Sequence, residues 1–310
     1  MNKNKRQCLL IVNPRSGTSE KARVIKRAIE HLSCNGWNVD VAYTERPAHA
    51  TELAANAVNM GFEAVVAVGG DGTVNETARA LVNTSATLGI IPMGSGNGLA
   101  RHMNIPVNPF RAIEIISGGN IEVCDYCTVN EHPFFCTFGV GFDAAVAQRF
   151  ASMPANRGFV NYIHSSFHEF INYKPQTYTI LSDNETITEN AFEVVCCNAA
   201  QYGNNAFIAP HASVTDGLMD ITIIHDASKF NHMLSGIDLL IGTIHENTRI
   251  HTFKTKELTI TRDANGPVHL DGEPMLMGNQ LKVCCHNKGI RIFSPGEMIV
   301  TPVLSSIGIK

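Results

Sequence analysis

Hydrophobic and polar positions alternate in two distinct ways along the first third of the chain. Continuous apolar runs, such as Leu9–Val12 and Ala64–Val68, are typical of strands that are buried on both faces. Between these runs, apolar residues recur three or four positions apart, as they do from Ala22 to Leu32, which predicts amphipathic helices. This order of strands and helices predicts a mainly parallel sheet covered by helices on both faces.

The pattern changes after about Asp125. The remaining chain contains short segments rich in β-branched and aromatic residues, separated by turn residues, which predict an antiparallel sandwich or barrel. These segments are Phe134–Phe138, Thr177–Leu181, Thr186–Glu189, Phe192–Cys197, Met219–Ile224, Glu257–Thr261, Leu281–Cys285 and Ile290–Phe293. Two helical inserts, at about 159–170 and 230–244, interrupt the series. We therefore expect an α/β domain in residues 1–125 and an antiparallel β-sandwich with helical inserts in residues 126–295.

The composition fits two ordinary globular domains. Of the 310 residues, 44% are hydrophobic and only 17% are charged, so intrinsic disorder is disfavoured. The formal net charge of -4 gives no general attraction to nucleic acid or to acidic membranes. No apolar run is long enough to span a membrane, and none resembles a signal peptide. We therefore expect a soluble cytoplasmic protein whose nine cysteines are reduced thiols.

Polar or glycine-rich segments follow each of the first four predicted strands. They are Asn13–Gly17, Thr44, Gly69–Thr73 and Gly94–Gly98. Because ligands of parallel sheets bind at the carboxyl ends of the strands, we expect these loops to converge on one edge and to form a binding site. Glycine lets backbone N–H groups approach a phosphate, and helices that start near Thr73 and Asn97 would direct their positive dipole ends at it. The sequence therefore predicts a phosphate-binding edge.

Local patterns refine this prediction. Thr73-x-x-Glu76 fits a capping box, in which the two side chains would order the start of the helix. The chain lacks the GxxxxGK[ST] motif, and Gly94-x-Gly96-x-Gly98 differs from the GxGxxG spacing. A P-loop enzyme and an ordinary dinucleotide dehydrogenase are therefore disfavoured.

Six motifs together carry a resemblance to a known family. They are Asn13-Pro-Arg-Ser-Gly17, Gly69-Gly-Asp-Gly-Thr-Val-Asn-Glu76, Pro92-Met-Gly-Ser-Gly-Asn97, Gly139-Val-Gly-Phe-Asp-Ala144, Asp216-Gly-Leu-Met-Asp220 and Asp271-Gly-Glu273. In this order, over nearly the whole chain, they resemble the diacylglycerol kinase catalytic-domain family, which includes bacterial soluble lipid kinases and sphingosine kinases. The resemblance implies an N-terminal nucleotide-binding domain, a C-terminal β-sandwich that binds lipid, a cleft between them, and a terminal segment, 296–310, that returns to the first domain.

The resemblance also implies roles for individual residues. Asp71 is expected near the catalytic metal and the phosphates, Asp125 as a second active-site aspartate, and Glu273 as the acceptor of the proton of the lipid hydroxyl. Asp216, with the carbonyl groups of Ser213 and Leu218, is similar to a Mg²⁺ site with oxygen ligands. The residues that resemble the family's ATP contacts are Asn13, Pro14, Arg15, Ser16, Gly17, Thr44, Gly70, Asp71, Gly72, Thr73, Val74, Asn75, Glu76 and Ser95.

Turn chemistry alone offers a simpler interpretation of several of these acids. Asp216-Gly217 and Asp271-Gly272 are each a hairpin-turn signal. The alternative interpretation of Asp71 is a turn aspartate that hydrogen-bonds its own loop. Asp125, taken alone, would be only a carboxylate at the end of a strand.

The chain departs from the family pattern at two positions. Thr18 stands where bacterial diacylglycerol kinases often carry a basic residue, which leaves Arg15, Lys21 or Arg23 to meet the phosphates. Gly98 occupies a position where an aspartate is common in those kinases, which is closer to the sphingosine kinases. The identity of the lipid is therefore left open.

The first helical insert carries two further patterns. The apolar stripe Phe159–Phe170 fits either core packing or an acyl channel. His164 and His168 lie one helical turn apart, a spacing that could hold zinc, but no third ligand is evident and a polar helix flank is favoured.

Together these features predict an ATP- and Mg²⁺-dependent lipid kinase, because phosphoryl transfer needs mainly positioning and charge neutralisation. The expected acceptor is diacylglycerol, giving phosphatidic acid, and a sphingoid base is the close alternative. An NAD kinase-like enzyme and a non-catalytic lipid-binding protein are the remaining candidates. We expect a cytoplasmic enzyme that meets its lipid peripherally at the membrane surface, without a transmembrane segment or a nucleic-acid partner. A homodimer is left open.

Overall fold

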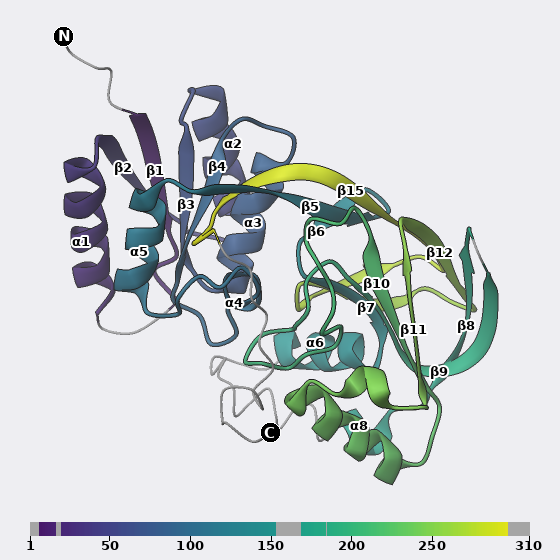
Figure 1. Ribbon diagram of the computed structural model, residues 1–310. Helices are drawn as coiled ribbons and strands as arrows, with labels where there is room; N and C mark the ends of the chain where they lie inside the picture. The colour runs from purple at the N-terminus through teal and green to yellow at the C-terminus, as the bar shows by residue number, and fades with distance from the viewer. Residues whose placement is uncertain (1–5, 17–19, 153–168, 184, 297–310) are drawn as a thin grey trace. The chain divides into compact units, whose positions relative to one another are not determined.

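The structure, a computed structural model, describes residues 6–16, 20–152, 169–183 and 185–296. Within these ranges the chain forms two compact units (Figure 1). Unit 1 contains residues 6–124 and 288–296, and unit 2 contains residues 125–287. The chain thus returns to unit 1 at Lys288, before the predicted terminal segment 296–310, of which 297–310 lie outside the described residues.

Unit 1 contains the predicted parallel sheet. Its strands are β1 (Arg6–Val12), β2 (Trp37–Tyr43), β3 (Ala64–Gly69), β4 (Thr87–Pro92) and the last residues of β15 (Gln280–Phe293). The order across the sheet is β15-β4-β3-β1-β2, and every pairing is parallel. Strands β3 and β4 are buried at every position, which explains their mostly apolar sequences.

Helices cover both faces of this sheet, as predicted. One face carries α1 (Lys21–Cys34) and α5 (Pro109–Gly118), and the other carries α2 (His49–Asn59) and α3 (Asp71–Leu81) (Figure 1). A short helix, α4 (Gly98–His102), follows β4.

Two local features hold these elements in place. Helix α2 ends at Asn59 with Met60 as its C-cap, and Gly61 follows with φ of 81°, the left-handed conformation that glycine often supplies after a helix. On the α1 face, Trp37 packs edge-on against Phe293, with 6.2 Å between the ring centroids. The end of β15 is therefore part of the core of unit 1.

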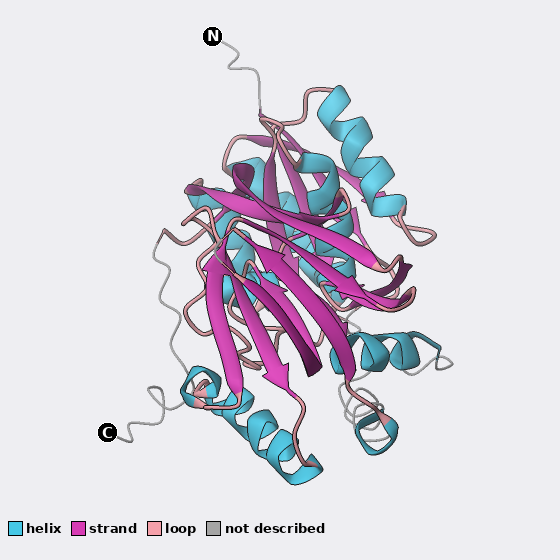
Figure 2. Cartoon of the chain, turned by 90° about the vertical axis from the view of Figure 1, so that its right-hand side faces the viewer, coloured by secondary structure: helices cyan, strands magenta, loops and turns pink. Residues whose placement is uncertain are grey.

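Unit 2 is the predicted antiparallel β-sandwich with helical inserts. Its strands are β5 (Ile121–Val129) from Asp125 onward, β6 (His132–Phe134), β7 (Thr137–Gly141), β8 (Gln176–Ser182), β9 (Thr186–Cys197), β10 (Met219–His225), β11 (Ile250–Thr255), β12 (Glu257–Arg262), β13 (Gly266–Leu270), β14 (Glu273–Met277) and β15 up to Asn287. Its helices are α6 (Phe142–Ser152), α8 (Lys229–Ile241) and the short 3-10 helix η1 (Ile244–Glu246). The strands are drawn as long magenta arrows in Figure 2.

One long strand, β9, belongs to both layers of the sandwich. Its first half pairs with β8, in a layer that continues through β12 to β15, whereas its second half lies between β7 and β10. Two clusters of buried side chains form the core of the unit: one includes Phe138, Val194 and Leu281, and the other includes Phe192 and Phe207.

Several strand boundaries differ from the prediction. Thr186–Glu189 and Phe192–Cys197 form one strand, β9, and Leu281–Cys285 and Ile290–Phe293 form one strand, β15. Phe134–Phe138 instead divides into β6 and β7, and the predicted series contains no segment for β5, β11, β13 or β14. Strand β9 alternates in exposure along its first half and is buried throughout its second half, so its change of pattern marks a change of surroundings and not a turn.

The two predicted helical inserts differ in how far the structure describes them. The second contains α8, which ends before Gly242 (φ 78°), and η1. Most of the first insert, with His164 and His168, lies in residues 153–168, outside the described part of the chain. None of the helices in the described ranges is long and apolar enough to cross a membrane.

Candidate active site

The loops after β1, β3 and β4 converge at the carboxyl edge of the parallel sheet in unit 1, as the sequence predicts. Backbone hydrogen bonds continue past the strand ends: Asn13 N donates to Val68 O (3.1 Å), and Met93 N donates to Gly69 O (2.7 Å). The loop after β2 is joined to them, because Thr44 N donates to Val12 O (2.9 Å). The four predicted segments thus lie on one edge.

The two glycine loops touch through their backbones. A Cβ atom added to Gly94 would lie 2.5 Å from the Cα of Gly70, and one added to Gly96 would lie 2.8 Å from Oδ2 of Asp71. Contacts this short require glycine whether or not a ligand is present. The sequence explained these glycines by the approach of a phosphate, and the structure adds the packing of one loop on the other.

Asp71 joins the same two loops through both of its carboxylate oxygens. Oδ2 accepts from Asn97 N (2.8 Å) and Oδ1 accepts from Gly98 N (2.7 Å). The Asp71 carboxylate therefore reaches beyond its own loop and binds the segment after β4. Asn97 has φ of 54°, a conformation that asparagine tolerates better than most residues.

The predicted capping box is wrong. Helix α3 begins at Asp71 and carries no side-chain cap, because Gly70 precedes it. Thr73 Oγ1 instead accepts from Asn13 Nδ2 (3.2 Å), and the Glu76 carboxylate accepts from Ala48 N (2.8 Å) and Ala50 N (3.1 Å) at the start of α2. These two side chains tie α3 to the β1 loop and to α2.

The three candidate cations near the β1 loop are arranged differently. Lys21 Nζ donates to the carbonyl oxygen of Asn13 (2.6 Å), and partial burial lowers the pKa of Lys21. Arg15 is exposed on the loop itself. Arg23 pairs with Glu20 (3.6 Å) and lies over the ring of Phe110 on α5 (5.2 Å). Lys21 and Arg15 are therefore the cations at the loop, and Gly17 and Thr18 lie outside the described residues.

The other predicted nucleotide contacts differ in exposure. Pro14 and Ser95 are exposed on the loops after β1 and β4, Ser16 is half-buried with its hydroxyl donating to Asn13 O (3.1 Å), and Gly72 lies in the first turn of α3. Val74 and Asn75 are buried in the face of α3. These two side chains can support the loop from within the fold.

In unit 2, Asp125 is almost fully buried in β5. Its Oδ2 accepts from Gly217 N (2.6 Å), and its backbone N donates to Val214 O (2.6 Å). Asp125 thereby holds the segment 214–217 against β5.

Asp216-Gly217 is not the hairpin turn that its sequence suggests. It lies near the end of the long connection, 198–218, between the paired antiparallel strands β9 and β10, so it is not a tight two-residue turn between them. The Asp216 carboxylate accepts from Lys254 Nζ (2.8 Å) and from Leu218 N (3.1 Å). Because the carboxylate is paired with an ammonium group, the site does not fit a Mg²⁺ ion as it stands. Among the described residues, no three acidic, histidine or cysteine side chains cluster as a metal site.

Asp271-Gly272 does form a hairpin turn, between β13 and β14, with φ of 50° and 81°. The Asp271 carboxylate also accepts three backbone N–H groups, from Phe135 (2.9 Å), Cys136 (2.7 Å) and Thr137 (2.9 Å). Sequence analysis missed this anchor, since its partners lie more than 130 residues away. Glu273, the first residue of β14, is half-buried directly after the anchored turn.

Behind that turn lies a buried polar network that the sequence did not indicate. Gly272 N donates to His269 Nδ1 (3.3 Å), so the ring proton lies on Nε2, which contacts Asp143 Oδ2 at 2.6 Å. The Tyr202 hydroxyl lies 3.1 Å from Asp143 Oδ2 and 2.8 Å from Glu193 Oε1. The motif around Asp143 was visible in the sequence, but Tyr202 and Glu193 carry no local signal.

The number of hydrogen-bond donors in this network indicates that one of its carboxyl groups is protonated. The Tyr202 hydroxyl has a single proton and two carboxyl partners, so one of the two carboxyl groups must donate. Burial, together with the charge of Asp143, raises the pKa of Glu193 well above its ordinary value. Both oxygens of Asp143 already lie 2.6 Å from nitrogen atoms, those of Ala144 N and His269 Nε2, so we infer that Glu193 is the carboxyl group that donates to Tyr202.

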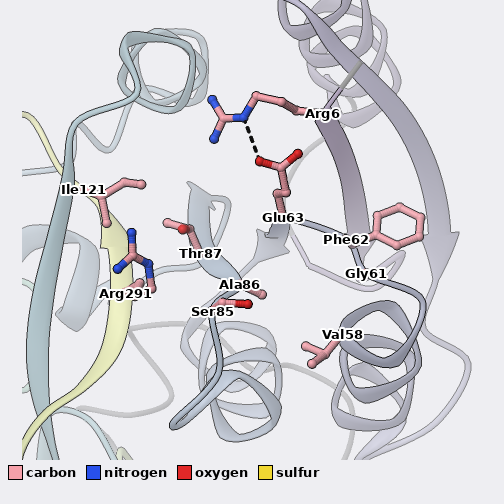
Figure 3. A pocket seen from close by; sticks show the side chains of 10 residues that line it. All are labelled: Arg6, Val58, Gly61, Phe62, Glu63, Ser85, Ala86, Thr87, Ile121 and Arg291. Carbon is pink, nitrogen blue, oxygen red and sulfur yellow. Dashed lines mark hydrogen bonds and ion pairs between the residues drawn. The ribbon is translucent and has the colours of Figure 1, made fainter. Parts of the chain in front are cut away.

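A cavity of about 280 Å³ in unit 1 is separate from these residues (Figure 3). Arg6, Glu63 and Thr87 line it at the amino ends of the parallel strands, and Arg6 Nε donates to Glu63 Oε2 (3.1 Å). It therefore lies at the opposite edge of the sheet from the glycine loops, and no predicted site residue lines it.

Comparison with known proteins agrees with the division into an α/β unit and a β-sandwich unit. The family described as "Diacylglycerol kinase catalytic domain" matches residues 7–129, and "YegS C-terminal NAD kinase beta sandwich-like domain" matches residues 136–288. A Mycobacterium tuberculosis protein named diacylglycerol kinase is 32% identical over 227 residues, which cover 71% of this chain and 73% of that protein. An Escherichia fergusonii protein named probable lipid kinase YegS is 28% identical over 273 residues, covering 86% and 89%.

A solved structure shares the fold. A crystal structure of a Bacillus anthracis protein superposes with a TM-score of 0.79 and 20% identity, and the match covers 95% of this chain and 99% of that one. The sequence matches and the loop geometry together identify the chain as a member of the diacylglycerol kinase catalytic-domain family of lipid kinases.

Proposed function

We propose that this protein transfers the γ-phosphoryl group of ATP to the hydroxyl group of diacylglycerol and so produces phosphatidic acid. The observation that carries the proposal is the contact between the Gly70 and Gly94 loops, bridged by Asp71, at the carboxyl edge of the sheet in unit 1. Backbone without side chains, at an edge where parallel sheets bind ligands, suits the close approach of phosphates.

The nucleotide would be held by the loops around this contact. The residues assigned to it are Asn13, Pro14, Arg15, Ser16, Gly17, Thr44, Gly70, Asp71, Gly72, Thr73, Val74, Asn75, Glu76 and Ser95. Lys21 and Arg15 supply positive charge beside the phosphates, and the Asp71 bridge keeps the two glycine loops in register. A bound Mg²⁺ would add neutralisation of the phosphate charge.

The acceptor chemistry is assigned to unit 2. Glu273 accepts the proton of the lipid hydroxyl, the hydroxyl oxygen forms a bond to the γ-phosphorus, and the bond to ADP breaks. Glu273 suits this role because Asp271, with three backbone donors, and His269 both fix the turn that carries it. Asp125 is assigned as the second active-site acid, which orients its neighbours from a buried position.

The nature of the substrate determines where the reaction takes place. Diacylglycerol resides in membranes, so a chain of this family would meet it peripherally, on the cytoplasmic surface. Gly98 leaves a sphingoid base as the competing acceptor, and the assay below decides between the two lipids.

The test is a transfer assay with purified protein, labelled ATP, Mg²⁺ and four acceptors in mixed micelles: diacylglycerol, a sphingoid base, ceramide and, in solution, NAD. We expect label in phosphatidic acid. Label in the sphingoid base or in NAD would reassign the acceptor, and no transfer to any of them would refute a catalytic role. Glu273→Gln is the inactive comparison, and Glu257→Gln, an exposed glutamate on β12, is its matched control.

A further inference from the structure

Lys254 lies at the centre of a group of oxygen atoms in unit 2. Its ammonium nitrogen is 2.8 Å from Asp216 Oδ2, 3.2 Å from Asp220 Oδ2 and 3.4 Å from the carbonyl oxygen of His211. Two carboxylates and a carbonyl are the kinds of ligand that hard divalent cations prefer. In this protein a side-chain cation occupies the position.

The strand register explains how Lys254 reaches these oxygens. Lys254 on β11 is the direct cross-strand partner of Asp220 on β10. Opposite charges at such a pair stabilise an antiparallel ladder. From there the long side chain extends to Asp216 in the segment before β10.

The segment before β10, residues 211–218, is also bonded to Asp125. Asp125 accepts from Gly217 N (2.6 Å) and donates to Val214 O through its backbone N (2.6 Å). The segment 211–218 is therefore fixed between Lys254 and Asp125. Removal of the positive charge would leave Asp216 and Asp220 facing each other without compensation.

We propose that Lys254 is the built-in cation of the 211–218 segment, in the place for which the family resemblance implies a Mg²⁺ ion held by Ser213, Asp216 and Leu218. The protein then needs no divalent metal to order this segment. This inference does not depend on the proposed reaction, because it concerns stability in the absence of nucleotide and lipid.

The test measures the melting temperature of metal-free protein, without nucleotide, and again with millimolar Mg²⁺ or Ca²⁺. Wild-type protein should change by less than about 1 °C on addition of either ion. Lys254→Met keeps the aliphatic stem and removes the charge, so its melting temperature should be lower by about 3–6 °C in the absence of metal. Either ion should then recover at least half of that loss, because it can enter the oxygen group that the ammonium has left.

Two further variants sharpen the result. Lys282→Met removes an exposed lysine whose ammonium lies 3.9 Å from Glu257, and it should change the melting temperature by less than about 1 °C. Lys254→Met combined with Asp216→Asn should abolish the recovery by metal.

Three outcomes would overturn the proposal. The first is wild-type protein that Mg²⁺ stabilises as strongly as it stabilises Lys254→Met. The second is a Lys254→Met protein with the melting temperature of the wild type. The third is a destabilised Lys254→Met protein that neither ion recovers, since the position would then accept only the lysine.

Discussion

Replacement of Gly94 by alanine tests the contact on which the proposed nucleotide site depends. The added Cβ would lie 2.5 Å from the Cα of Gly70 and 3.0 Å from Oδ1 of Asn97. An ordinary contact begins at 3.4 Å, so the two loops must separate by about 0.9 Å. The neighbour is backbone, and no side-chain rotation can relieve the clash.

The magnitude follows from what that displacement disturbs. Overpacking of this kind costs about 1–3 kcal/mol. It also stretches the bonds from Asn97 N and Gly98 N to Asp71, which are charge-assisted and short. We therefore expect the free energy of unfolding of Gly94→Ala to fall by about 2 kcal/mol, and the melting temperature by about 4–8 °C. The affinity for ATP should fall at least about tenfold, because displacements near 1 Å strongly affect positioning.

The assays are denaturant unfolding and calorimetric titration with ATP. Gly118→Ala, at the end of α5, is the control, because its added Cβ would meet nothing within 4 Å and its stability should change by less than about 0.5 kcal/mol. A Gly94→Ala protein with wild-type stability would refute the loop contact. A destabilised protein with wild-type ATP affinity would refute its role in the nucleotide site.

Three further substitutions test unit 2. Glu273→Gln should lower kcat by about 10²- to 10⁴-fold, with melting temperature and ATP affinity unchanged; near-normal turnover at saturating lipid would exclude Glu273 as the base. Asp271→Asn should lower the free energy of unfolding by about 1.5–3 kcal/mol in denaturant titrations, because an uncharged side chain with one oxygen replaces the acceptor of three N–H groups, and wild-type stability would contradict that anchor. Gly139→Ala should fail to fold or should melt many degrees lower, since its Cβ would lie 2.4 Å from His269 Nε2, whereas Gly236→Ala has open space and should melt as the wild type does.

The local sequence pattern was sufficient to predict the architecture and the positions of the loops. Strand β3 and the end of β1 from Cys8 onward are continuous apolar runs, and the segments that follow them are polar or glycine-rich, so both the sheet and its binding edge could be predicted. The Asp271-Gly272 turn is likewise a local property of two residues.

The partners of individual side chains could not be predicted in the same way. Thr73 and Glu76 have capping-box spacing, but their side chains bond Asn13 and the start of α2, which only the folded sheet brings near. The role of Lys254 depends on the pairing of β11 with β10, and the pattern does not reveal β11. Spacing along the chain reports local structure, whereas these roles depend on contacts between distant segments.

The protonation of Glu193 leads to a prediction about pH. A glutamate whose pKa is raised in the folded state contributes stability below the pKa of the unfolded chain, and that stability is lost as the pH rises towards the folded value. Glu193→Gln cannot ionise, and its amide can donate to Tyr202 as the protonated carboxyl does. Each unit of pKa elevation is worth about 1.4 kcal/mol, so the free energy of unfolding of Glu193→Gln relative to the wild type should increase by on the order of 1 kcal/mol or more between pH 5 and pH 8. Urea titrations at the two pH values measure this, with Glu257→Gln as the exposed control. A Glu193→Gln protein whose stability relative to the wild type does not increase between the two pH values would mean that Glu193 is ionised and that Asp143 carries the proton.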